Sequence, residues 1–146
     1  MQLTLFSDYT LRTLIYLGSH PGQTVPAAQI AEAFGASSDH LTKAAKWLSQ
    51  RGLVTGVRGK AGGLLLSCNP AELRVGKLLR QTEPSVDLLE CFNRASNTCP
   101  IAPACKLKQA LFEAREAFFA VLDQYTVADL IENRPQLLSL LRRPQR

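Results

Sequence analysis

The sequence has little histidine, tryptophan or methionine: two His, one Trp and one Met occur in 146 residues. It also lacks a continuous apolar run of about 20 residues, the length that a membrane-spanning helix needs. The start, MQLTLFSDYTLRTLIYL, has neither a basic region nor a small-residue cleavage site, so it does not resemble a secretory signal peptide. We therefore expect a protein of the cytoplasm with no membrane partner.

Catalytic motifs are missing as well. The chain shows no evident nucleophile–base pair, carboxylate dyad or glycine-rich phosphate loop. We therefore do not expect an enzyme. The composition is otherwise that of a globular domain, with 46% hydrophobic and 20% charged residues. A chain of 146 residues can bury one modest core.

Acidic residues are fewer than basic ones, and the basic excess is concentrated in one stretch. The chain has 17 Lys and Arg against 12 Asp and Glu, a net charge of +5. Residues 37–63 contain a single acidic residue, Asp39, and these basic residues: Lys43, Lys46, Arg51, Arg58 and Lys60. Such a stretch indicates a surface that faces phosphates. On charge alone, an ordinary solvated surface is an equal alternative.

Hydrophobic periodicity predicts three helices in the first third of the chain. The first spans about residues 3–17, with Ser7 or Asp8 as the expected cap. A short second helix, AAQIAEAF, is followed by a glycine-containing turn and a third helix with Ser38 as its N-cap. Two helices joined by such a turn, the second of them basic, are typical of a helix-turn-helix.

Two short apolar runs of strand length follow, at residues 53–55 and 64–66. The segment between them, GVRGKAGG, is rich in glycine and carries two cations. Two strands with such a tip form a wing whose amides and cations suit a phosphate backbone or a minor groove. We therefore predict a mainly α fold with a small β-wing, a winged helix-turn-helix DNA-binding domain over residues 1–84. A small α+β fold with a purely structural hairpin is the alternative.

The predicted DNA contacts come from the third helix and the wing. Serine hydroxyls donate to phosphates, and cations supply the salt-dependent part of the affinity. The candidate residues are Ser37, Ser38, His40, Lys43, Lys46, Arg58 and Lys60. The expected partner is a double-stranded DNA operator.

A long helical pattern begins at Cys105 and continues to Tyr125. Its apolar stripe consists of Leu107, Leu111, Ala114, Phe118, Val121, Leu122 and Tyr125. At 1.5 Å per residue the stripe is roughly 30 Å long, more than one small domain can cover. A second copy of the chain can cover it, so we predict a homodimer with residues 105–146 as dimerisation helix and tail. Packing on its own domain alone is the alternative.

Three of the four cysteines, Cys91, Cys99 and Cys105, lie in an irregular segment that we call the cysteine loop, residues 85–105. Cys105 precedes the long helix, whose positive N-terminal end favours a thiolate. The wide spacing fits a structural zinc site poorly, because zinc sites favour paired cysteines two to four residues apart. Three thiolates in one loop suit an iron–sulfur cluster with a different fourth ligand. We expect Cys68 to be a small buried residue.

These features together carry a family resemblance. The run LTLFSDYTLRTLIYL, the helix-turn-helix, the RGKAGG wing and the three cysteines resemble the Rrf-type bacterial iron–sulfur winged-helix regulators over about residues 1–132. The segments CPIAPACKLKQAL and AFFAVLDQYTVADL are most similar to the members that repress transcription and sense nitric oxide.

The resemblance implies a ligand set. In such members three cysteines hold a [4Fe–4S] cluster and an aspartate early in the other subunit's first helix completes it. The matching residues are Cys91, Cys99, Cys105 and Asp8 of the partner subunit. A histidine used by a related regulator of cluster assembly is replaced by Lys108, which is no ligand while protonated. A [2Fe–2S] form stays open.

The resemblance also implies a function. The expected protein is a homodimeric repressor whose operator affinity is switched when its cluster reacts with nitric oxide. Two alternatives remain at this point. One is a thiol-based redox sensor without a cluster, and the other is a regulator of the same type that responds to a different signal.

Overall fold

The computed structural model describes residues 2–59 and 61–142, so Lys60, one of the predicted DNA contacts, lies outside the described residues. The elements are α1 (Leu5–Ser19), α2 (Ala27–Phe34), α3 (Ser38–Gln50), β1 (Val54–Val57), β2 (Gly63–Leu66), η1 (Pro70–Glu72), α4 (Val75–Thr82), η2 (Glu90–Phe92), η3 (Ala102–Ala104), α5 (Lys106–Leu122), η4 (Asp129–Ile131) and α6 (Arg134–Leu141). The predicted fold class, mainly helical with a small antiparallel wing, is confirmed. None of the described helices combines the length and hydropathy that crossing a bilayer requires.

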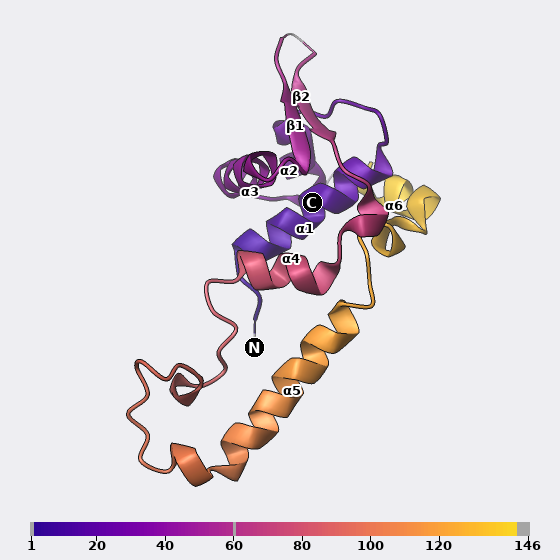
Figure 1. Cartoon of the computed structure of the whole chain (residues 1–146). Helices are drawn as coiled ribbons and strands as arrows, with labels where there is room; N and C mark the ends of the chain where they lie inside the picture. The colour runs from indigo at the N-terminus through magenta and orange to yellow at the C-terminus, as the bar shows by residue number, and fades with distance from the viewer. Residues whose placement is uncertain (1, 60, 143–146) are drawn as a thin grey trace.

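Helix α1 is the central element of a unit that we call the head, formed by α1–α4 and the wing. It lies against α2, α3, α4 and β2 (Figure 1). Its residues Leu14 and Leu17 pack with Ile30, Leu41 and Leu48, and each of these side chains is at most 1% exposed. Burying one such side chain stabilises the fold by about 1.5–3 kcal/mol. This core fixes α3 relative to α1.

The start of α1 differs from the prediction. Thr4 has an extended backbone and its hydroxyl accepts a hydrogen bond from the Ser7 N–H at 3.2 Å, so the prediction that Ser7 or Asp8 caps the helix was wrong. Ser7 is instead fully buried, and its hydroxyl donates to Thr82 Oγ1 at 2.7 Å. The Thr4 N–H donates to Glu83 Oε1 at 3.0 Å. These contacts tie the start of α1 to the end of α4.

The turn between α2 and α3 follows the predicted chemistry with a shift of one residue. Gly35 has a left-handed backbone, with φ 58°, and ends α2. The N-cap position of α3 is occupied by Ser37, and Ser38 is the first helical residue, so the predicted cap was one residue late. Gly52, with φ 69°, follows the end of α3 as expected.

The wing is joined to the rest of the head by a third backbone segment. Strands β1 and β2 pair antiparallel with Val54 opposite Leu66. Val25, between α1 and α2, exchanges two backbone hydrogen bonds with Leu64, at 2.9 and 2.7 Å. The Val25 backbone occupies the space that a side chain on Gly63 would need, so only glycine fits there.

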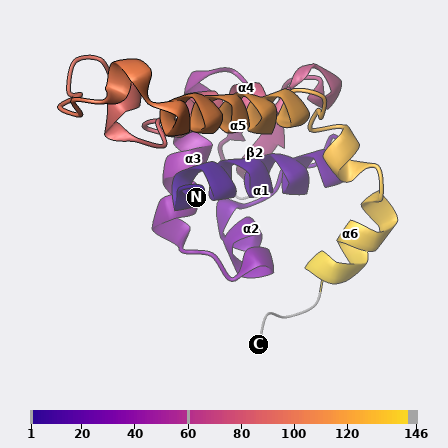
Figure 2. The same cartoon turned by 90° about the horizontal axis from the view of Figure 1, so that it is seen from below.

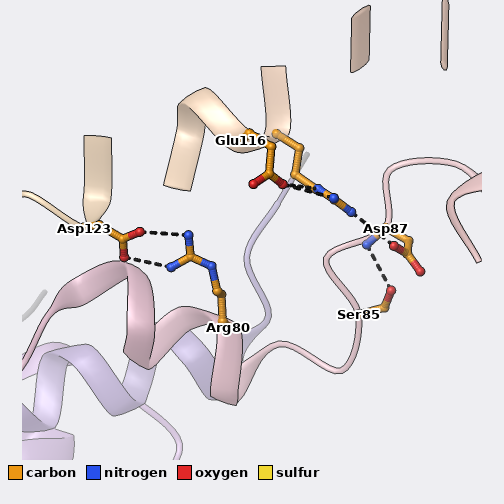
Figure 3. A network of polar contacts seen from close by, with 6 residues as sticks. Arg80, Ser85, Asp87, Glu116 and Asp123 are labelled. Carbon is orange, nitrogen blue, oxygen red and sulfur yellow. Dashed lines mark hydrogen bonds and ion pairs between the residues drawn. The ribbon is translucent and has the colours of Figure 1, made fainter. Parts of the chain in front are cut away.

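A second small core joins α4 to α5. Val75, Leu79 and Phe119 form it, each at most 5% exposed. Arg80 on α4 donates two hydrogen bonds to the Asp123 carboxylate, at 2.7 and 2.8 Å (Figure 3). These hydrogen bonds hold the pKa of Asp123 below its usual value. The C-terminal end of α5 is therefore fixed to the head, while its N-terminal part projects away (Figures 1 and 2).

After α5 the chain returns to the head. The Val75 N–H donates to the Tyr125 carbonyl at 2.9 Å, and Val127 is fully buried in the main core. Helix α6 follows near the end of α1 (Figure 2), where Arg134 Nε donates to the Ser19 carbonyl at 2.8 Å. The segment predicted as a dimerisation helix and tail, residues 105–146, thus contains a projecting helix and a returning part that packs on the head.

Candidate DNA-binding surface and cysteine loop

Helix α3 turns one face to the core and the opposite face to solvent. The buried positions, at most 6% exposed, are Leu41, Ala44, Ala45 and Leu48. The predicted contacts Ser37, Ser38, His40, Lys43 and Lys46 are all exposed. His40, Lys43 and Lys46 follow one another at intervals of three residues, so they line one edge of the helix. All five candidates therefore lie at solvent-exposed positions of α3 and its N-cap.

A contact between α1 and α3, which the sequence reasoning missed, lies beside His40. The Tyr9 ring meets the His40 ring edge to face, with centroids 5.9 Å apart. The Arg12 guanidinium lies 5.7 Å from the Tyr9 centroid and pairs with Asp8 at 2.8 Å. The spacing of Asp8 and Arg12 by four residues was the available signal for that ion pair. Asp8 is thus linked through α1 side chains to the exposed edge of α3.

The wing tip presents Arg58 to solvent at the end of β1. Next to it, Gly59 has a positive φ of 112°, and the Gly62 N–H donates to the Gly59 carbonyl at 2.9 Å, which closes the turn. Wing and α5 project from opposite sides of the head (Figure 1). The wing can therefore approach a ligand without contact from α5.

The cysteine loop connects α4 to the projecting end of α5 (Figure 1). Cys91, in η2, is 6% exposed, and Cys99 and Cys105 are partly buried. The Cys99 N–H donates to Asn97 Oδ1 at 3.0 Å. Cys105 is the N-cap of α5, and its Sγ accepts a hydrogen bond from the Lys108 N–H at 3.4 Å. The predicted start of the long helix at Cys105 is confirmed, and this sulfur lies at the positive helix end.

The donor chemistry of this loop fits an iron–sulfur centre, because the three cysteines are free thiols and soft sulfur is the ligand such clusters take. The geometry is open. Within residues 2–59 and 61–142, no three His, Cys, Asp or Glu side chains come together in a group that could hold a metal ion. Asp8 belongs to α1 in the head, whereas the loop lies beyond the far end of α5 (Figure 1). Binding would therefore require the loop to close around the metal.

The fourth cysteine, Cys68, lies outside this loop and is partly buried. Its thiol donates to the Leu53 carbonyl at 3.4 Å. Burial raises the pKa of this thiol above its ordinary value, which disfavours the thiolate that metal binding needs. Cys68 thus has the character of a packing residue.

Comparison with known proteins identifies the family. Residues 3–133 match the family model Rrf2, described as an iron-dependent transcriptional regulator. The chain belongs to the Rrf2 family. The resemblance inferred from the HTH, wing and cysteine pattern is therefore confirmed, and this Rrf2 protein is a DNA-binding transcriptional regulator.

Relatives cover nearly the whole Rrf2 chain. It is 44% identical over 142 residues to the HTH-type transcriptional regulator NsrR of Shouchella clausii, covering 97% of this chain and 95% of the relative. It is 41% identical over 143 residues to NsrR of Bacillus subtilis, with 97% and 98% coverage. The crystal structure of the oxidized form of Staphylococcus aureus CymR aligns with a TM-score of 0.70 and 28% identity, covering 90% of this chain and 97% of that one.

Proposed function

We propose that the protein is a homodimeric repressor whose affinity for its DNA operator depends on an iron–sulfur cluster that reacts with nitric oxide. One observation carries the proposal. Three free cysteines lie in a single loop of a chain that belongs to an iron-dependent regulator family and is 44% identical to an NsrR protein. Such a regulator acts on DNA in the cytoplasm and performs no catalysis.

The proposed ligands are Cys91, Cys99 and Cys105 with Asp8 of the partner subunit, and the proposed cluster is [4Fe–4S], with [2Fe–2S] as the alternative. When bound, the cluster supplies iron that reacts with nitric oxide. A carboxylate is a hard ligand among soft thiolates, so Asp8 would be the weakest iron ligand of this set. In the structure Asp8 pairs with Arg12 at 2.8 Å, so metal binding by Asp8 would compete with this ion pair.

A homodimer is proposed because α5 carries exposed apolar side chains near both of its ends. Leu107 and Val121, which share one face of the helix, are 61% and 54% exposed. A second copy of α5 would cover them and bring the head of one chain toward the cysteine loop of the other. Asp8 of the partner subunit then becomes available to that loop.

Contacts in the head connect the loop to the DNA-binding surface. The buried Ser7–Thr82 hydrogen bond, at 2.7 Å, links α1 to the end of α4, where the chain leaves for the cysteine loop. The Tyr9 ring in turn contacts His40 on α3. A dimer that reads two half-sites needs its recognition helices about 34 Å apart. A hundredfold loss of affinity corresponds to only about 2.7 kcal/mol of coupling between the two sites.

The direct test is a nitric oxide titration. Protein purified without oxygen, or reconstituted with iron and sulfide, is titrated while visible absorption and operator binding are followed in the same sample. We expect a coloured protein that loses colour and DNA affinity together. A coloured protein that keeps its operator affinity through complete bleaching would contradict the proposed switch.

A second test asks which subunit supplies Asp8. The variants Asp8→Ala and Cys99→Ala are prepared separately and as a mixed dimer. Alone, Asp8→Ala should lose its cluster quickly to a chelator and Cys99→Ala should remain colourless. In the mixed dimer, the cysteines of the first variant meet Asp8 of the second, so we expect a fraction with the slow cluster loss of the wild type. If Asp8 bound within its own chain, no mixed dimer would contain a complete site and this fraction would be missing.

Disulfide-based sensing is the second candidate function. The free thiols and the similarity to the oxidized form of CymR favour it. It predicts a colourless protein after reconstitution, whose operator affinity falls with peroxide and returns with dithiothreitol.

A further inference from the structure

Arg115, on α5, is an arginine whose side chain is only 16% exposed. Its guanidinium lies 5.0 Å from the Phe92 ring centroid and 4.8 Å from the Phe112 centroid. Two carboxylates also approach it, Asp87 at 3.4 Å and Glu116 at 3.0 Å (Figure 3). A single side chain thus joins two aromatic rings and two acidic groups.

One ring comes from the cysteine loop and the other from α5, the helix that follows it. Phe92 directly follows Cys91 in η2. Phe112 belongs to α5 and, together with Cys105, lines an open hollow at the exit of the loop. The rings meet edge to face, with centroids 6.3 Å apart. Arg115 therefore connects the arm that carries Cys91 to the helix that Cys105 caps.

The rings matter more than the carboxylates in this arrangement. A guanidinium over an aromatic face gains strength when it is desolvated, as Arg115 largely is. Its ion pairs involve Asp87 and Glu116 side chains that are 34% and 54% exposed, and solvent screens such pairs strongly. Loss of the ring contacts should therefore loosen the attachment of the loop to α5 more than loss of the ion pairs.

Among the described residues, the cysteine loop has one long-range hydrogen bond, which Arg115 donates to Asp87 at 3.4 Å, and its other hydrogen bonds are local. For residues 88–104 they reach at most eight positions along the sequence, as between Thr98 and Glu90. Local bonds form turns but do not place the loop against a helix. The contact of the two rings with Arg115 therefore has the main part in holding the Cys91 arm to α5.

We propose that Arg115 is a positioning residue for the cysteine loop: it stacks on Phe92 and Phe112 and so holds the Cys91 arm against α5 and keeps Cys91 buried. An arm held in this way samples fewer conformations before its thiol meets a metal, which favours binding. The metal-binding purpose rests on the function proposed above. The placement of Cys91 itself is a property of the cluster-free chain.

Arg80, on α4, provides a matched control because it also contacts α5. Its guanidinium lies 4.2 Å from the Phe119 centroid and pairs with Asp123, so it makes the same two kinds of contact. Those partners belong to the end of α5 at the head, away from the loop. Arg80→Gln therefore removes a smaller set of the same kinds of contact without touching the Cys91 arm.

The test measures thiol accessibility in cluster-free protein under native conditions. Wild type, Arg115→Gln, Arg115→Lys and Arg80→Gln are treated with N-ethylmaleimide, and the modification of each cysteine is followed by peptide mass spectrometry. We expect Cys91 to react about tenfold faster in Arg115→Gln, because the arm opens more often without its ring contacts. Arg115→Lys should react nearly as fast, since lysine keeps the charge but lacks the planar stacking group.

If Arg115 places Cys91 specifically, the increase in the modification rate should be confined to the cysteine loop. Cys68 should keep its wild-type rate in all variants, and Cys91 should keep it in Arg80→Gln. Equal Cys91 rates in wild type and Arg115→Gln would overturn the proposal. Faster reaction of Cys68 together with Cys91 would overturn it as well, because that pattern reports general loosening of the fold.

Reconstitution with iron and sulfide separates this inference from the proposed function. In Arg115→Gln we expect the visible absorption to decay about tenfold faster in the presence of a chelator, in parallel with the labelling. A wild type that takes up no iron would refute the cluster-based function. The labelling rates would still decide whether Arg115 places Cys91.

Discussion

Replacing both Lys43 and Lys46 with glutamine should lower operator affinity by about a hundredfold or more at 0.1 M salt. Both side chains are exposed on the outer edge of α3. Each phosphate contact releases about 0.9 of a counterion, and in a homodimer the double variant removes four cations. The slope of log affinity against log salt should therefore become shallower by about 3 to 4. Fluorescence anisotropy with a labelled operator, measured across a salt series, gives both quantities.

The matched control removes two lysine charges from exposed positions outside α3. Lys77 on α4 and Lys106 at the start of α5 are also exposed but do not belong to α3. Their double replacement by glutamine should change affinity less than about threefold and leave the salt slope nearly intact. An equal loss of slope in both double variants would show that net charge alone acts, and would reject this edge of α3 as the DNA-contacting surface.

Replacing Leu79 with alanine should lower the free energy of unfolding by about 2–5 kcal/mol. Leu79 is 1% exposed and fills the small core between α4 and α5 with Val75 and Phe119. Truncation there loses apolar burial and leaves a cavity. Because a domain is stable by only about 5–15 kcal/mol, this is a large fraction of the total. Urea denaturation followed by circular dichroism measures the change.

Leu140 on α6 gives the same chemical change at an exposed site, with 51% of the residue accessible. Leu140→Ala should cost less than about 0.5 kcal/mol. Both variants are compared at one protein concentration, because dimerisation would make apparent stability depend on it. Equal losses in the two variants would contradict the tight packing between α4 and α5.

Local chemistry explains what the sequence predicted well. The left-handed Gly35 turn, the wing with its glycine-rich tip and the start of α5 at Cys105 each depend on a few neighbouring residues. Such features leave a signal in the sequence, because backbone φ preferences and capping groups act over one or two turns. The DNA-contact candidates on α3 were chosen for their hydroxyl and cationic side chains, and their contacts with DNA stay a prediction.

Contacts between distant segments were the part that the sequence could not supply. The N-cap Thr4 gains Glu83 as a second partner through tertiary structure. The apolar stripe assigned to a partner chain omitted Phe119, the residue with which α5 packs most deeply against α4. Periodicity shows that a helix has an apolar side, but two apolar edges of one helix can have different partners.

The cysteine loop shows a different limit. The sequence predicted Cys91, Cys99 and Cys105 as metal ligands, yet the described residues do not gather them into a metal-binding group. Thiols have little attraction for one another without a metal, so the free energy that would assemble them comes from the ligand itself. A sequence can therefore predict metal ligands even though their arrangement around a metal is visible neither in the sequence pattern nor in the metal-free fold.

The return of the chain after α5 determines which fragments of the protein can keep the core of the head. Arg74 forms a backbone bridge with Thr126, so the segment of residues 83–125, which contains the cysteine loop and α5, leaves the head at one end of α4 and rejoins it at the other. These two ends are separated by the 8 residues of α4, about 12 Å. Cutting the chain at residue 105 would not isolate the head, because it would remove the fully buried Val127. Excising this segment and bridging the ends of α4 with a short linker would keep Val127 in the head, but it would also remove Phe119 and so uncover Val75 and Leu79.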